Sequence, residues 1–232
     1  MGRTIVFWMF ILLTGQIAFS KDELDNLLAS LDKYTLTNNI SISGESASYI
    51  VSSSTPVMNS RFKLVKFNGN VFYEDEYHTL IMKPLYDIWL DHKNKQIYIS
   101  YKVPQKQKNN RYLNPSGIFE LVKSQVKDCY VKFENDGSKR YTINYNPLVT
   151  DCIQSIAEID KNDELKSILY FFTEKSYLSK TVIKYQSIST AIIDEKDFVN
   201  TNTYVIQNGN KWSASGTYKN YKIQIFDYEE LF

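Results

Sequence analysis

The sequence predicts an α+β protein that is mainly antiparallel β, with a curled, open-barrel sheet whose concave face is covered by helices. Three observations support this fold class. Apolar residues alternate with polar ones in several short runs that Asn, Asp and Gly separate. Aromatic residues make up 15% of the 232-residue chain, and Tyr and Phe favour pleated, half-buried surfaces. An amphipathic helix near the start has an apolar stripe that must cover a sheet, and long antiparallel sheets tend to curl as strands accumulate.

The first 20 residues are typical of an export signal. Arg3 is their only charge, an uninterrupted apolar run follows over 5–13, and the segment ends in Ala18-Phe19-Ser20. A basic start, an apolar core and small residues at the end are the three parts of a signal peptide. The apolar run is shorter than the about 20 residues of a spanning helix. We therefore predict cleavage after Ser20 rather than a retained anchor, and a single exported β domain over 21–232, with 187–232 as a C-terminal extension.

The charge balance restricts the partners. The chain has 27 basic and 26 acidic residues, and losing Arg3 leaves the exported part neutral. Nucleic acids and anionic membranes both select clustered positive charge. We therefore expect neither as the main partner, and no nucleic acid.

Two cysteines, Cys129 and Cys152, are the only ones in the chain. An isolated pair in an exported protein is more often a disulfide than two free thiols. Closing a loop of this length is worth about 3 kcal/mol in the chain-entropy model. We predict the bridge, with two free buried thiols as the alternative.

Two helices are predicted. The first covers 22–34, where an apolar stripe follows helical spacing and acidic residues occupy the first turn. Its stripe consists of Leu24, Leu27, Leu28, Leu31 and Tyr34. The second covers 114–122, with Asn114 as the N-cap and Pro115 in the first helical position.

The rest of the chain reads as successive hairpins, which build an antiparallel meander. The clearest turn is Asn68-Gly69, because a type I′ turn needs two positive φ angles. A second such turn is Asn135-Asp136-Gly137. The predicted strand pairs are 61–67 with 70–77, 87–91 with 96–100, 129–133 with 141–145, and 165–172 with 178–185. Single strands are predicted over 47–53 and 221–225.

No motif for catalysis is recognised. His78 and His92 have no nucleophile or metal-binding pattern beside them, so we interpret both as solvated or edge-strand residues. Carboxylates occur in pairs that a glycosidase or a calcium site would use, but no calcium loop accompanies them. The pairs are Glu74 with Glu76, Asp87 with Asp91, and Glu158 with Asp160. We expect no enzyme, no metal and no cofactor, and keep a glycan hydrolase as the third hypothesis.

Aromatic residues crowd the region 62–101. Such side chains form a core, stack on sugars from an exposed face, or line a lipid pocket. The sequence leaves these three interpretations open.

The order of elements resembles the LolA/LolB-like superfamily of periplasmic lipoprotein carriers, particularly divergent members from Bacteroidetes-type bacteria. The similarity lies in the signal peptide followed at once by the helix, in the stretch from Phe62-Lys63-Leu64 through Leu85-Tyr86-Asp87-Ile88-Trp89-Leu90 to Gln96-Ile97, and in the late hairpin that begins at Leu165. The resemblance covers about half of the exported chain. A cavity arginine of the best-known carriers has Arg61 as its nearest candidate here, and 203–232 has no counterpart.

The resemblance implies a periplasmic carrier, associated with the cell envelope, for a hydrophobic ligand such as a lipid or a lipoprotein acyl chain. The residues expected to bind that ligand are Phe62, Leu64, Phe72, Ile81, Trp89, Leu28 and Leu31. An envelope protein is an expected second partner, and the chain is expected to be a monomer. The alternative is a non-catalytic structural or interaction module of the cell envelope, in which side chains fill the concave face.

Overall fold

The computed structural model describes residues 39–102, 125–148, 150–191, 200–209 and 211–227, together with single positions between 23 and 37. The predicted signal peptide, its cleavage after Ser20 and the predicted helix at 114–122 lie outside these residues.

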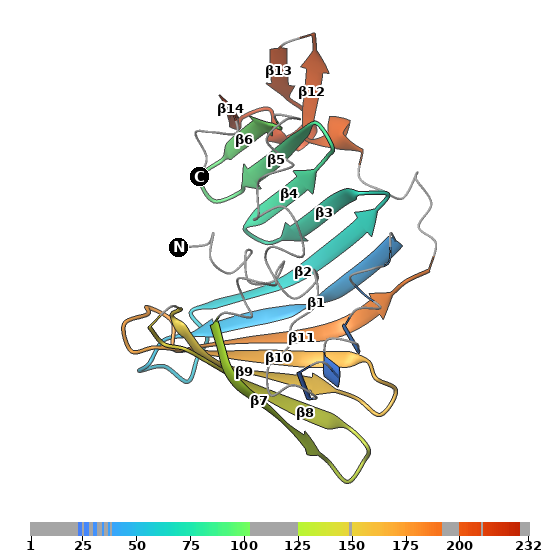
Figure 1. Cartoon of the computed structure of the whole chain (residues 1–232). Coiled ribbons are helices and arrows are strands. Elements are labelled where there is room, and N and C mark those ends of the chain that lie inside the picture. Colours follow the sequence, from blue (N-terminus) through green and yellow to red (C-terminus); the bar gives the residue numbers. More distant parts are fainter. Residues whose placement is uncertain are drawn as a thin grey trace. The chain divides into compact units, whose positions relative to one another are not determined.

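Twelve strands form one sheet in the order β14-β6-β5-β4-β3-β2-β1-β11-β10-β9-β8-β7, and β12 and β13 form a second, two-stranded sheet (Figure 1). The described neighbours pair antiparallel except β14, which runs parallel to β6. The large sheet has two edge strands, β14 and β7, and is therefore open. The mainly antiparallel fold class is confirmed.

The first six strands are β1 (Asn39–Tyr49), β2 (Met58–Phe67), β3 (Asn70–Asp75), β4 (His78–Met82), β5 (Tyr86–Asp91) and β6 (Gln96–Tyr101). The next five are β7 (Val126–Phe133), β8 (Lys139–Tyr145), β9 (Cys152–Ile159), β10 (Leu165–Phe172) and β11 (Lys180–Ser189). The C-terminal elements are η2 (Thr201–Thr203), β12 (Val205–Asn208), β13 (Lys211–Ala214), η3 (Gly216–Tyr218) and β14 (Lys222–Asp227).

The chain divides into two compact units, which we describe separately. Unit 1 comprises 1–37, 44–60 and 110–186, and unit 2 comprises 38–43, 61–109 and 187–232. That the exported chain is a single domain stays a prediction.

The predicted hairpins are confirmed, with some shifts in their bounds. Asn68 and Gly69 have φ angles of 47° and 76°, as the predicted tight turn between β2 and β3 requires. In the β7–β8 turn only Gly137 has a positive φ, of 86°. The strand predicted at 47–53 instead begins at Asn39.

The polar sequence of β1 explains that shift. Its serines find hydrogen-bond partners on neighbouring strands, which lets a Ser-rich segment enter a sheet. Ser48 Oγ lies 2.9 Å from Thr181 Oγ1, and Ser43 Oγ lies 2.8 Å from Ser187 Oγ. Ile40 and Ile42 point to the buried side. The strands β4 and β9 were not predicted.

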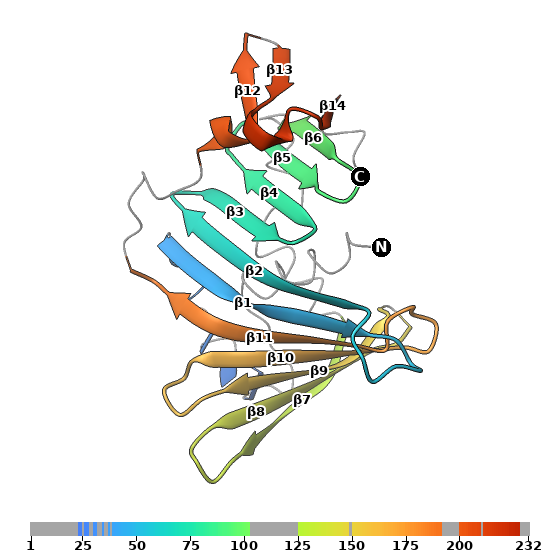
Figure 2. The ribbon, with the colours of Figure 1, turned by 180° about the vertical axis from the view of Figure 1, so that it is seen from behind.

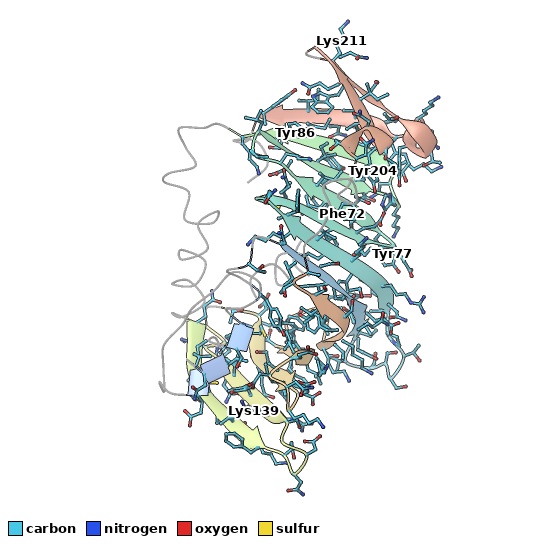
Figure 3. The ribbon with its side chains drawn as sticks, turned by 90° about the vertical axis from the view of Figure 1, so that its right-hand side faces the viewer. Phe72, Tyr77, Tyr86, Lys139, Tyr204 and Lys211 are labelled. Atoms are coloured by element: carbon cyan, nitrogen blue, oxygen red, sulfur yellow. The ribbon has the colours of Figure 1, made fainter. Side chains whose placement is uncertain are left out.

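The first helix contributes to the core of unit 1. The described positions Leu24, Leu27, Leu31 and Tyr34 are helical and buried. Figures 1 and 3 place these helical positions beside β7–β10. Burial, and after it the charge of Glu23, raises the pKa of Cys129 on β7. The predicted stripe is therefore confirmed at these four positions, whereas Leu28 lies outside the described residues.

Unit 2 has a core of its own, which lies between one face of the sheet and the C-terminal segment. We name the sheet face made by Val65, Phe72, Ile81, Ile88, Leu90, Ile97 and Ile99 the covered face. Tyr204 and Val205 are buried against it, with Trp212, Tyr218 and Tyr221 around them. The predicted C-terminal extension thus has more than one role: 187–189 end β11, the described residues of 200–221 form a layer on the covered face, and β14 extends the sheet beside β6 (Figure 2). The expectation that helices cover the sheet is corrected for this face, because short strands and 3₁₀ turns cover it instead.

Aromatic contacts anchor this layer. Trp212 Nε1 donates to the Tyr101 hydroxyl at 2.6 Å, and the Trp212 ring meets the Tyr86 ring edge-on at 5.1 Å. Gly216 has a φ of +56°, and a Cβ there would lie 3.1 Å from the Thr203 carbonyl oxygen. Lys211 lies at the tip of the β12–β13 hairpin (Figure 3).

Candidate functional site

The face of the unit 2 sheet opposite the covered face is aromatic and only partly buried. Cross-strand partners share a face, and Leu64, Tyr73, Leu80, Trp89 and Tyr98 follow one another across β2–β6. We name this surface, together with Phe62 and Phe226, the aromatic face. Phe62, Leu64 and Tyr73 are buried, whereas Leu80, Trp89, Tyr98 and Phe226 are half-buried.

A row of rings runs across the aromatic face. The Trp89 ring lies 5.7 Å from the His78 ring and 5.9 Å from the Tyr98 ring, and Tyr98 stacks with Phe226 at 6.1 Å. These separations are those of favourable aromatic pairs. Each ring holds its neighbour in place, so the row presents a preformed apolar surface that alkyl chains or planar groups can contact.

At one end of the aromatic face lies the carboxylate of Asp75, which already accepts several hydrogen bonds. Asp75 accepts hydrogen bonds from the Tyr73 hydroxyl at 2.7 Å and from the backbone N–H groups of Tyr77 and His78 at 2.8 and 2.6 Å. Burial alone would raise the pKa of Asp75, but hydrogen bonds from His78, Tyr73 and the backbone lower it. Asp75 therefore stays ionised and fixes the β3–β4 turn and Tyr73.

The other end carries a buried ion pair. Lys102 Nζ lies 2.8 Å from Asp87 Oδ1 and donates to the Lys83 carbonyl oxygen at 2.8 Å. Burial raises the pKa of Asp87, and Lys102 offsets this only in part. Beside them, the buried Ser100 Oγ has no hydrogen-bond partner among the described residues. Because Ser100 Oγ is unpartnered there, this end can accept a polar group.

The predicted ligand-binding residues separate in the structure. Phe62, Leu64 and Trp89 lie together on the aromatic face. Phe72 and Ile81 point to the opposite side and belong to the filled, covered face. Leu31 is buried in unit 1, and Leu28 lies outside the described residues. The prediction that these seven form one site is therefore corrected for Phe72 and Ile81, because neighbouring residues of a strand face opposite ways.

The predicted disulfide does not form. Cys129 and Cys152 are free and buried. They lie on β7 and β9, and β8 runs between those strands. Two strand spacings of roughly 4.8 Å exceed the Cα separation of about 7 Å beyond which a disulfide cannot close. Burial raises the pKa of each thiol to about 12, so both stay protonated and unreactive.

The structure also corrects the interpretation of His92 as a solvated residue. His92 Nε2 lies 2.9 Å from Thr79 Oγ1, and Nδ1 lies 3.2 Å from the Tyr221 hydroxyl oxygen. Burial lowers the pKa of His92, and Glu74 is the first of the nearby carboxylates that oppose this. His92 therefore joins the β5–β6 turn to the C-terminal layer. Its sequence position in a turn gave no signal of this.

In two of the three predicted carboxylate pairs, Asp87 with Asp91 and Glu158 with Asp160, each carboxylate has a partner of its own. Glu158 lies 2.8 Å from Arg140 and accepts from Ser167 at 2.6 Å, and Asp160 lies 3.0 Å from Lys166. Among the described residues, no group of three or more His, Cys, Asp and Glu side chains is placed to hold a metal ion. Within the same residues, no helix is long and apolar enough to cross a bilayer.

Comparison with known proteins was informative only for solved structures, since no family model and no curated protein matches the chain. A conserved, uncharacterised protein from Thermus thermophilus is 9% identical, with a TM-score of 0.46 over 87% of this chain and 98% of that one. A LolA superfamily protein from Nitrosomonas europaea is 9% identical, with a TM-score of 0.35 over 75% and 96%. LprF from Mycobacterium bovis is 11% identical, with a TM-score of 0.37 over 72% and 93%.

The structure from Nitrosomonas europaea is described as a member of the LolA superfamily, which the sequence also resembles.

Proposed function

We propose that the chain is an exported, non-enzymatic binding protein or carrier for a hydrophobic ligand, such as a lipid or an acyl chain, which lies on the aromatic face of unit 2. One observation carries this proposal. Leu80, Trp89, Tyr98 and Phe226 remain half-buried in a continuous row, whereas the opposite face of the same strands is sealed by the C-terminal layer.

The physical basis is the removal of apolar surface from water. Each Å² of apolar surface buried contributes about 25 cal/mol, and an alkyl chain along the row covers both itself and the rings. Phe62, Leu64 and Tyr73 are already buried and support the row from β2 and β3. Of the residues predicted to bind the ligand, Phe62, Leu64 and Trp89 are retained, and Leu80, Tyr98 and Phe226 are added.

The finer parts of the proposal are a lipoprotein acyl chain as the ligand, a periplasmic location, release to an envelope protein partner, and a monomeric state. The resemblance of the sequence to periplasmic lipoprotein carriers supports them. Neutral charge suits an uncharged ligand rather than nucleic acid.

The two tryptophans of the exported chain allow a sharp test, because Trp89 lies on the aromatic face and Trp212 packs on the covered face. Trp8 is removed with the predicted signal peptide. A brominated fatty acid quenches a tryptophan that it touches. In the Trp212→Phe variant the remaining Trp89 should be quenched in a saturable manner, whereas in the Trp89→Phe variant the remaining Trp212 should not.

Native mass spectrometry of protein from its host's envelope is the second measurement, and a co-purified lipid is expected. Equal quenching of both single-tryptophan variants, or none in either together with no co-purified lipid, contradicts the proposal. The second result would favour the alternative of a non-catalytic structural or interaction module. The filled covered face is the observation that favours that alternative, since it shows that one of the two sheet faces is core.

A further inference from the structure

Four exposed apolar side chains gather on loops at one end of unit 1. The loops are 50–57 between β1 and β2, the described residues 146–148 and 150–151 between β8 and β9, and 173–179 between β10 and β11. Leu148 is 90% exposed, Val51 75%, Tyr177 57% and Val57 40%. We name these four residues the apolar rim. Scattered exposed apolar residues are normal, but a group at one end of a unit is informative.

Backbone hydrogen bonds hold the three loops side by side. Ser179 N donates to the Tyr49 carbonyl oxygen at 2.8 Å, and Thr173 N donates to that of Asp151 at 2.8 Å. Lys180 Nζ lies 4.4 Å from the centre of the Tyr49 ring. Figures 1 and 2, seen from opposite sides, both place these loops together. The rim is therefore built by segments far apart in the sequence.

The loops themselves are ordered in a way that keeps their tips exposed. Leu148 N donates to Asn146 Oδ1 at 3.0 Å, and Ser53 Oγ donates to the Thr55 carbonyl oxygen at 2.6 Å. These local bonds fix tight turns whose apolar side chains point outward. The turns therefore hold Leu148 and Val51 in exposed positions, where both can contact a partner.

The charge of the rim selects among partners. The only charged residues within the three loops are Asp151, Glu174 and Lys175, and the remaining polar residues are mostly Ser and Thr. Removing water from loops with so few charges costs little free energy. The loops also offer no cluster of positive charge for an anionic surface. Tyr, with an apolar ring and a polar tip, suits a membrane–water interface. A protein partner would need about 800 Å² of complementary surface, which is more than these four side chains offer.

We propose that the apolar rim is the surface by which this protein docks on a zwitterionic lipid bilayer, with Val51, Leu148 and Tyr177 entering the interfacial region. The rim belongs to unit 1 and the proposed ligand surface to unit 2, so each can fail without the other. The predicted export would carry the chain across a bilayer and so bring it to a lipid surface.

Vesicle flotation tests the proposal. The exported protein, with its N-terminus checked by mass spectrometry, is mixed with phosphatidylcholine vesicles and centrifuged through a density gradient. We expect the wild type to float with the vesicles, and the triple variant Val51→Ser, Leu148→Ser, Tyr177→Ser to lose at least about five-fold in bound fraction. Phe133→Ser is the matched control, because Phe133 is 69% exposed in the same unit at the opposite end of β7. It should float like the wild type.

Salt separates apolar docking from electrostatic attraction. Raising the NaCl concentration should leave the bound fraction unchanged, since screening acts on charges and not on apolar burial. Binding that needs anionic phosphatidylglycerol, or that disappears in salt, overturns the proposal. So does a wild type that fails to float, or a triple variant that floats equally. A dimer that the triple variant converts to a monomer, without vesicle binding, would assign the rim to a second copy instead.

A fluorescent label gives a readout that does not depend on the triple variant folding. Cys129 and Cys152 are buried and unreactive, so a polarity-sensitive thiol dye will attach selectively to Leu148→Cys or, as the control, to Phe133→Cys. Vesicles should shift the emission of the dye to the blue at position 148 and not at position 133. An equal shift at both positions, or none at 148, contradicts the proposal.

Discussion

The two faces of the unit 2 sheet are built from the same strands yet differ in what lies on them. The covered face is mainly aliphatic, and the C-terminal layer reduces the exposure of Ile81, Ile88, Leu90, Ile97 and Ile99 to zero. On the aromatic face the rings of Trp89, Tyr98 and Phe226 stay half-buried, whereas Phe62 and Tyr73 are buried. A carboxylate lies at one end of this face and an ion pair at the other. The comparison shows that the complete burial of the aliphatic side chains coincides with the packing of Tyr204 and Val205 against them.

The largest expected effect lies on the covered face. Ile88→Ala removes a side chain that is 0% exposed, and should lower the free energy of unfolding by about 2–5 kcal/mol because a cavity remains. The matched change on the aromatic face, Leu80→Ala, should cost about 1–2 kcal/mol, since Leu80 is half-buried. Urea denaturation measures both. Equal losses would show that the two faces are packed alike.

The ion pair on the aromatic side gives the next effect. Lys102→Met leaves Asp87 charged and unpaired in a site where Lys102 is 10% exposed, and should cost about 2 kcal/mol. Arg140→Met breaks the exposed pair with Glu158 and should cost about 1 kcal/mol or less. Burial raises the pKa of Asp87, and a raised carboxyl pKa favours the folded state as pH falls. The Lys102→Met loss should therefore shrink at low pH.

A smaller effect sharpens the role of the C-terminal layer. The pKa of His92 is lowered by burial, so the unfolded chain takes up a proton before the folded one. The stability contributed by neutral His92 is complete above its ordinary pKa of about 6.5. It is lost as pH falls from there toward the lowered pKa of the folded state. The melting temperature of the wild type should therefore fall more between pH 8 and pH 5 than that of His92→Gln. If the melting temperatures of the two proteins change equally with pH, neutral His92 does not stabilise the C-terminal layer.

In unit 1, adding a reducing agent should have no effect on stability. Since Cys129 and Cys152 are free, a reducing agent should leave the melting temperature unchanged. Their pKa values of about 12 should keep both thiols unreactive toward a disulfide reagent at pH 8, and both should react once the chain is denatured. If a reductant lowered the melting temperature, this result would support the disulfide that the sequence predicts.

The fold could be predicted from the sequence wherever local chemistry decides it. Asn68-Gly69 fixed a tight turn, and the alternation of apolar residues located β5, β6, β8 and β10. The partner of β14 could not be predicted, because alternation indicates a strand but not its neighbour. The Ser-rich β1 was misplaced, since the hydrogen bonds that stabilise it come from residues of β11 far along the chain.

The opposite orientations of Leu64 and Phe72 follow from the sequence. A two-residue turn at Asn68-Gly69 sets Phe67 opposite Asn70, and therefore Leu64 opposite Tyr73 and Val65 opposite Phe72. This register alone places Phe72 on the other side of the sheet from Leu64. The role of the C-terminal layer was not available in this way, because nothing in the residues of 203–227 indicates which face they cover.

The parallel pairing of β14 with β6 has a consequence for the order of folding. Hairpins β2 to β6 can form as soon as their residues have been synthesised, since each strand pairs with its predecessor. The edge at β6 and the aliphatic surface beside it must wait for Tyr204, Trp212 and Lys222 to emerge. Until then the unpaired edge of β6 and the apolar surface beside it are exposed to other chains. Truncation of the last segment should therefore favour aggregation over a smaller soluble protein.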